Sequence, residues 1–167
     1  MFALETKTSK LLGWNYKYLC TFYGILNVCE IVICYACLDL IRNSCRPAYS
    51  HSTGGFVGSA AETYFYLATC ACMVITCIFL CSFIVSHISF LLMERTILGI
   101  MFWLTATLLS FVTSLALIIF INESKNVEIY GYSHKAAASI LGLINSALYL
   151  INTVKSYRAC KLSWSYQ

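Results

Sequence analysis

Four long apolar runs dominate this sequence and restrict what the chain can fold into. They cover residues 18–38, 64–85, 97–121 and 136–154, and none of them contains proline. A helix that crosses the bilayer core, which is about 30 Å thick, needs roughly 20 apolar residues, the length of these runs. Strands of a membrane barrel would alternate in polarity, and these runs do not. Because backbone groups that face lipid must be satisfied within their own segment, we expect an all-α, integral membrane four-helix bundle.

The composition supports lipid as the solvent for most of the chain. Of the 167 residues, 60% are hydrophobic and 11% are charged, whereas soluble domains carry about 25% charged residues. We therefore expect a transmembrane domain over residues 18–154, between a short cytosolic segment at residues 1–17 and a cytosolic tail at residues 155–167. No cleavable signal peptide is expected, because the first 17 residues contain no apolar stretch of signal length.

The basic residues predict the orientation of the helices. Cytoplasmic segments of membrane proteins are enriched in Lys and Arg. With both termini in the cytosol, seven of the 11 basic residues lie on the cytosolic side and four on the opposite side. The seven are Lys7, Lys10, Lys17, Arg95, Lys155, Arg158 and Lys161. The four are Arg42, Arg46, Lys125 and Lys135.

The net charge of +4 is expected to serve contact with anionic lipid. The sequence has no basic cluster interleaved with aromatic residues away from the membrane, so nucleic acid is not an expected partner. The expected location is the plasma membrane, vesicles, or both.

Glu30 is the one acidic or basic residue inside the four runs. A charged side chain at mid-membrane is costly, with insertion scales giving roughly 2.5–3.5 kcal/mol for aspartate. No Lys or Arg lies at that depth, so we expect a protonated carboxyl that is hydrogen-bonded to another helix. Asn27 lies one helical turn earlier on the same face. The fourth run carries Asn145 and Asn152, which should face protein, and Asn145 is the expected partner of Glu30.

Small residues recur every four positions in the third and fourth runs. Such stripes let helix backbones approach closely, where lipid supplies no hydrophobic force for association. We therefore expect helix-packing seams on both segments, within one chain or between two copies. The seam residues are Ala106, Ser110, Ser114, Ala138, Gly142 and Ser146.

Two of the ten cysteines, Cys34 and Cys37, form a CxxC motif. A quinone-linked membrane thiol oxidoreductase similar to vitamin K epoxide reductase would use such a pair. However, the pair lies near the C-terminal end of its helix, where the helix dipole disfavours a thiolate. Cys45 is alone in the outer loops, so no second pair is present to shuttle electrons and no loop disulfide is expected. We favour cysteine as a small apolar packing residue.

Other candidate sites are few. Cys20 and Cys160 are juxtamembrane thiols on the expected cytosolic side, where palmitoylation occurs. Asn122 begins a glycosylation sequon, but it lies too close to the expected bilayer surface for modification. The three histidines are far apart in the sequence, and the glycines at positions 54, 55 and 58 lack the strand and helix of a phosphate loop. We expect no catalytic residues, no metal and no cofactor.

Three stretches of the chain resemble a known family. They are NVCEIVICYACLDL, with an acid inside the first run, ETYFYLATCACMVITCIFL, with an acid and aromatics opening the second, and AAASILGLINSALYLINTVKSYR, which closes the fourth. Together they resemble the MARVEL family of four-helix membrane proteins, nearest to its chemokine-like-factor branch and to insect singles-bar-like proteins. The resemblance covers residues 17–161. Chemokine-like-factor relatives often carry an acid at the start of the third helix, where this chain has RTIL.

The resemblance implies a function without catalysis. MARVEL proteins are associated with vesicle trafficking, membrane apposition and junctions, and singles-bar-like proteins with myoblast fusion. The expected partners are the lipid bilayer and other membrane proteins, including further copies of the chain. A small transporter or channel is the alternative, and it would need several polar groups lining one path. The spans offer chiefly Asn27, Glu30, Asn145 and Asn152 for that purpose.

Overall fold

The computed structural model describes residues 16–44, 59–85, 97–123 and 131–164. These residues form a short 3₁₀ helix, η1 (Tyr16–Cys20), and four long helices, α2 (Phe22–Ser44), α3 (Ala60–Val85), α5 (Ile97–Glu123) and α6 (Tyr132–Trp164). All four long helices have the length and apolar composition needed to cross a membrane. The prediction of an all-α bundle with four membrane-length helices is confirmed, and four such helices make the chain an integral multi-pass membrane protein.

Several predictions concern residues outside the described part of the chain. They are the absence of a disulfide at Cys45, the reading of the glycines at 54, 55 and 58, the position of residues 165–167, most of the segment at 1–17, and the sides taken by Lys7, Lys10, Arg46, Arg95 and Lys125.

The helices extend beyond the apolar runs that predict them. The fourth run ends at residue 154, whereas α6 continues to Trp164. The second run begins at residue 64, whereas α3 begins at Ala60. Apolar length reports only the part of a helix that lies in hydrocarbon, and backbone hydrogen bonding carries a helix onward into the headgroup region.

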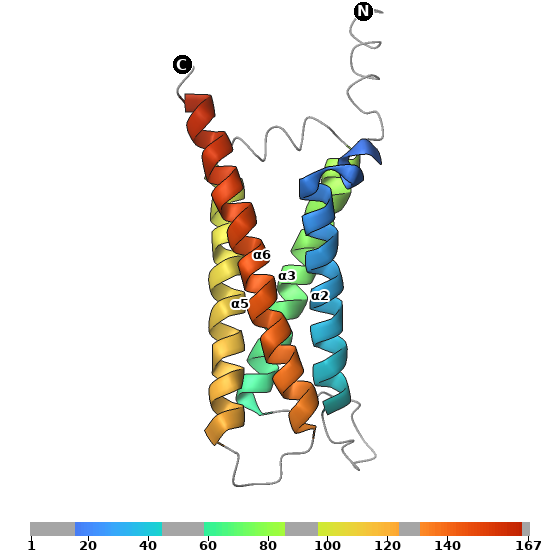
Figure 1. The fold of residues 1–167 in the computed structure, drawn as a ribbon, viewed down its shortest axis with the longest axis vertical. Helices are drawn as coiled ribbons and strands as arrows, with labels where there is room; N and C mark the ends of the chain where they lie inside the picture. The colour runs from blue at the N-terminus through green and yellow to red at the C-terminus, as the bar shows by residue number, and fades with distance from the viewer. Residues whose placement is uncertain (1–15, 45–58, 86–96, 124–130, 165–167) are drawn as a thin grey trace, which may run out of the picture.

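The four helices form an up-and-down bundle in which successive helices run antiparallel (Figure 1). Each helix packs against two neighbours, α2 against α3 and α6, and α5 against α3 and α6. The start of α2 and the end of α6 lie at one end of the bundle (Figure 1), which we call the terminal end. The opposite end, where α2 and α5 finish and α3 and α6 begin, is called the far end.

Polarity is inverted relative to a soluble bundle. Large apolar side chains such as Val32, Leu108 and Ile119 face outward, whereas Ser, Thr and Asn side chains and two carboxyls are buried. Apolar side chains are as stable in contact with lipid as in contact with protein, so they can face outward. Polar side chains are unfavourable in hydrocarbon, so they form hydrogen bonds with one another inside the bundle.

The small-residue stripes lie inside the bundle, between helices of one chain. Ala106, Ser114 and Ala138 are buried. A methyl group placed on Gly142 of α6 would overlap the Ser114 hydroxyl of α5 and lie 2.9 Å from the Phe65 ring of α3. Gly142 is therefore a point of close approach between α3, α5 and α6, and a larger residue there would force the helices apart.

Candidate functional site

The inward face of α2 carries the polar residues of the first span. Asn27, Glu30, Cys34 and Cys37 follow one another at intervals of three or four residues and are all buried. This spacing places their side chains on one face of the helix. That face lies against α6, so the two helices form a polar seam through the apolar bundle.

Glu30 is fully buried and is bonded to α6. Asn152 donates a hydrogen bond from Nδ2 to Glu30 Oε1 at 2.7 Å. The prediction that Asn145 is the partner of Glu30 is wrong, because Asn145 Nδ2 instead lies 3.1 Å from Cys34 Sγ. The helices are antiparallel, so Glu30, nearer the terminal end than Cys34, meets Asn152, which is nearer that end than Asn145.

The seam continues from Glu30 toward the terminal end. Asn152 Nδ2 also lies 3.4 Å from Asn27 Oδ1. Asn27 in turn donates from Nδ2 to the Tyr18 hydroxyl at 3.0 Å. A chain of hydrogen-bonding side chains therefore joins the Glu30 carboxyl to η1, at the terminal end of the bundle.

Tyr149 of α6 joins all four helices at the middle of the bundle. Its hydroxyl lies 3.2 Å from Thr76 Oγ1 of α3 and 3.7 Å from Cys34 Sγ of α2. Its ring stacks on Trp103 of α5, with ring centroids 6.0 Å apart. The side chain is 0% exposed. This residue therefore closes the interior between the Glu30 seam and the far end.

Three oxygen atoms along the seam lack a partner among the described residues. They are Glu30 Oε2, Asn145 Oδ1 and Asn152 Oδ1, all buried. Buried polar atoms are rarely left unpaired, because each lost hydrogen bond costs about 1–3 kcal/mol. All three are acceptor atoms when the carboxyl is ionised, so the seam has a shortage of donors or of positive charge.

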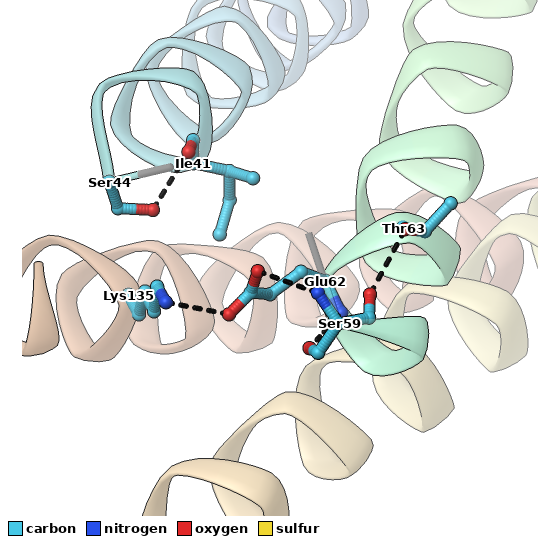
Figure 2. A network of polar contacts seen from close by, with 6 residues as sticks. All are labelled: Ile41, Ser44, Ser59, Glu62, Thr63 and Lys135. Atoms are coloured by element: carbon cyan, nitrogen blue, oxygen red, sulfur yellow. Dashed lines mark hydrogen bonds and ion pairs between the residues drawn. The ribbon is translucent and has the colours of Figure 1, made fainter. Parts of the chain in front are cut away.

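A second polar cluster lies at the far end, where an ion pair joins the first turns of α3 and α6 (Figure 2). Lys135 Nζ lies 2.7 Å from Glu62 Oε1, and both side chains are nearly fully buried. Glu62 Oε2 accepts a hydrogen bond from the backbone N–H of Ser59 at 3.0 Å, while Ser59 Oγ accepts from the Glu62 N–H at 3.3 Å. This reciprocal arrangement is a capping box, which satisfies the first N–H groups of α3.

Glu62 and Lys135 lie just outside the apolar runs at residues 64–85 and 136–154, and nothing in the sequence pairs them. A signal for half of the cluster was present, because Ser59 and Glu62 have the S-x-x-E spacing of a capping box before an apolar run. No such spacing exists for the pairing with Lys135, which lies 73 positions later in the printed sequence.

The far end also contains a close backbone approach. Gly131 has a φ of 73°, and a Cβ at this position would lie 2.8 Å from Ser44 Cβ. Both the left-handed conformation and the lack of space call for glycine. The start of α6 therefore packs directly against the last residue of α2, beside the ion pair.

The two cysteines of the CxxC motif are buried in separate contacts. Cys34 is in contact with Asn145 and Tyr149, whereas the Cys37 thiol lies 3.6 Å from the Ala138 carbonyl oxygen of α6. Both are at most 1% exposed. Thiol–disulfide exchange requires access of an attacking thiolate to sulfur, which this packing denies.

We expect the protein to migrate identically on reducing and non-reducing gels. The nine cysteines in the described part of the chain are all free. The monomer band is compared with and without reductant, after free thiols have been blocked during lysis. Cys34→Ser and Cys37→Ser are the matched variants, and a reduction-dependent shift that either variant abolishes would favour the redox enzyme.

The modification candidates differ in accessibility. Cys20 is exposed at the terminal end, whereas Cys160 is 7% exposed. Acyl transfer to sulfur needs an accessible thiol, so Cys20 is the better placed of the two. Asn122 is exposed and lines a cavity of about 330 Å³ between α5 and α6.

Among the described residues, no three His, Cys, Asp or Glu side chains are grouped so that they could hold a metal ion. Comparisons with protein-family models, with curated proteins and with solved structures find no match to this chain.

Proposed function

We propose that this protein is a MARVEL-like membrane organiser that acts in vesicle trafficking, membrane apposition or cell–cell fusion, including myoblast fusion, without catalysing a reaction. The observation that carries the proposal is the interior closed by Tyr149, which contacts α2, α3 and α5 at once. A bundle that is packed through its middle presents its outer surface and its ends to partners. Those surfaces suit contacts with lipid and with other membrane proteins.

The outer surface supports a role in lateral contacts. Exposed aliphatic and aromatic side chains cover the helices, among them Tyr35, Tyr64 and Phe111. The small-residue seam is occupied by contacts within the chain, with Gly142 against Ser114 and Phe65. Partner proteins or further copies would therefore meet large apolar side chains, which bind through shape and van der Waals contact in lipid.

A small transporter is the second candidate, and it is favoured by the chain of hydrogen bonds that runs from Tyr18 through Asn27 and Asn152 to Glu30. A transporter needs access to its site from both sides of the membrane. On the far side of Glu30, the Tyr149 ring is stacked on Trp103 and bonded to Thr76, so passage would require this contact to open.

Reconstitution into vesicles separates the two functions. The purified protein is placed in two vesicle populations with different dyes, and docking is followed by fluorescence cross-correlation while ion and proton flux are measured in parallel. An organiser should promote docking or recruit trafficking and adhesion proteins in a proximity-labelling experiment in its own cells, with flux equal to that of empty vesicles. Flux that Glu30→Gln abolishes, without docking or such neighbours, would establish the transporter instead.

The proposed orientation has both termini in the cytosol, and it gives a separate prediction. Epitope tags at either end should survive protease treatment of intact cells and disappear only after permeabilisation. The terminal end carries Lys155, Arg158 and Lys161 on α6, the charge bias typical of a cytosolic side. A tag inserted after Gly54, on the proposed outer side, is the matched control. Loss of a terminal tag in intact cells would contradict the orientation.

A further inference from the structure

We propose that Glu30, with the neighbouring Asn152 amide, forms an exchangeable binding site for one small monovalent cation, a proton or a sodium ion. The site lies on the seam between α2 and α6 and is joined to the terminal end by hydrogen-bonded side chains. It goes beyond the organising function and does not depend on it.

The charge of the seam is the first argument. The titratable groups near Glu30 are Tyr18 of η1, Cys34 of α2, Cys72 of α3 and Tyr149 of α6. All four are acids and carry no positive charge in any protonation state. Trp103 of α5 packs against Cys72 and Tyr149, and its side chain does not titrate. Within the part of the chain that the structure describes, an ionised Glu30 therefore has no cationic side chain beside it.

The described cations lie elsewhere. Lys135 is paired with Glu62 at the far end. Lys155 is at the terminal end, where its ammonium group lies 3.1 Å from the centre of the Phe22 ring. A buried carboxylate without a counter-charge is strongly unfavourable, so a cation must accompany the ionised form.

The unpaired oxygens are the second argument. Glu30 Oε2 and Asn152 Oδ1 are buried and have no partner among the described residues, and the two side chains are joined by a hydrogen bond of 2.7 Å. Carboxylate and amide oxygens are hard donors that suit proton binding and small hard cations. A bound water would satisfy lone pairs but would leave the charge uncompensated, whereas one monovalent cation supplies both.

The route to the site is the third argument. Asn152, Asn27 and Tyr18 form a continuous polar chain from Glu30 to η1. A carboxyl that never exchanged its proton would not need hydrogen-bonded side chains that connect it to the end of the bundle. On the other side the Tyr149 contacts close the interior, so exchange is expected from the terminal end alone. Binding there would alter the contact between α2 and α6 without moving an ion across the membrane.

The test uses dicyclohexylcarbodiimide, an apolar reagent that adds to protonated carboxyls within membranes. The full chain in lipid nanodiscs is treated between pH 5 and pH 9 in N-methylglucamine chloride, and the Glu30 adduct is quantified by peptide mass spectrometry. A proton site predicts at least a fivefold fall in the adduct as pH rises. A sodium site predicts that NaCl at constant ionic strength protects Glu30, and that Asn152→Leu removes the protection. Asp39→Asn, which alters an exposed carboxyl on the same helix, should label at Glu30 as the wild type does.

Thermal unfolding of the same samples is a second readout, which tests the proposal even if the reagent fails to reach Glu30. The melting temperature of the wild type should respond to pH or to sodium, and that response should be lost in Glu30→Gln. The proposal is overturned if the adduct is insensitive to both pH and sodium, or if no adduct forms and Glu30→Gln responds to both as the wild type does.

Discussion

Replacing Tyr149 with alanine is expected to destabilise the bundle strongly. The ring is fully buried and contacts Trp103, and its hydroxyl meets Thr76 and Cys34, so all four helices lose a contact. Aromatic-to-alanine changes in packed interiors cost about 3–5 kcal/mol. Tyr149→Phe retains the ring and loses only the hydroxyl contacts, for which about 1 kcal/mol is expected.

The measurement is the free energy of unfolding in mixed micelles, titrated with a denaturing detergent. Tyr157→Ala is the matched control, because Tyr157 lies on the same helix and is 57% exposed. The expected order of stability is wild type and Tyr157→Ala together, then Tyr149→Phe, then Tyr149→Ala. Equal stability of Tyr149→Ala and Tyr157→Ala would show that Tyr149 does not join the helices.

Breaking the far-end ion pair is the change with the second largest expected effect. Lys135→Met leaves the Glu62 carboxylate buried without its counter-charge, and removing one partner of a buried pair typically costs about 3–5 kcal/mol. Glu62→Gln removes the charge but keeps a side-chain oxygen that can accept the hydrogen bond from the Ser59 backbone N–H. The double variant Glu62→Gln/Lys135→Met removes both charges and is expected to recover at least half of the loss.

Asp39→Asn is the control for this experiment, because Asp39 is exposed and bonded to Asn43 one turn away. Exposed charges of this kind contribute about 0–1 kcal/mol. The expected result is positive coupling between Glu62 and Lys135 in a double-mutant cycle. If the two single losses simply add, the ion pair does not hold α3 against α6.

The fold was predictable because lipid imposes a simple rule on sequence. A helix in hydrocarbon needs about 20 apolar residues, and that requirement located all four long helices, including α5, whose start at Ile97 matches the start of the third run. The ends of α3 and α6 were not predictable in the same way. At those ends the helix is continued by a capping box and by backbone hydrogen bonding, which hydropathy does not measure.

The residues of the candidate site could be predicted from the sequence, but the hydrogen bonds between them could not. Asn27, Glu30, Asn145 and Asn152 were expected to face protein, and all four are buried. Which asparagine meets Glu30 depends on how far α6 is shifted along α2. That shift is set by close approaches such as Gly131 on Ser44 and Gly142 on Ser114 and Phe65, which arise from several helices together.

The ion pair between Glu62 and Lys135 was missed for a related reason. Polar residues near the ends of apolar runs are usually assigned to water, and both residues lie just outside the predicted spans at 64–85 and 136–154. The structure buries them because α3 and α6 begin side by side at the far end, with Ser44 of α2 beside them (Figure 2). Proximity of two helix starts cannot be inferred from the composition of either helix.

The seam between α2 and α6 is the central feature of this account, and the coupling between Glu30 and Asn152 tests it most directly. Free energies of unfolding are measured for Glu30→Leu, Asn152→Leu and the double variant, and in parallel for the cycle of Glu30→Leu with Asn145→Leu. The hydrogen bond at 2.7 Å predicts a coupling of about 1–2 kcal/mol for Glu30 with Asn152. For Asn145, whose amide group is bonded to Cys34, a coupling below about 0.5 kcal/mol is expected. Strong coupling of Glu30 to Asn145 with none to Asn152 would contradict the placement of α6 against α2.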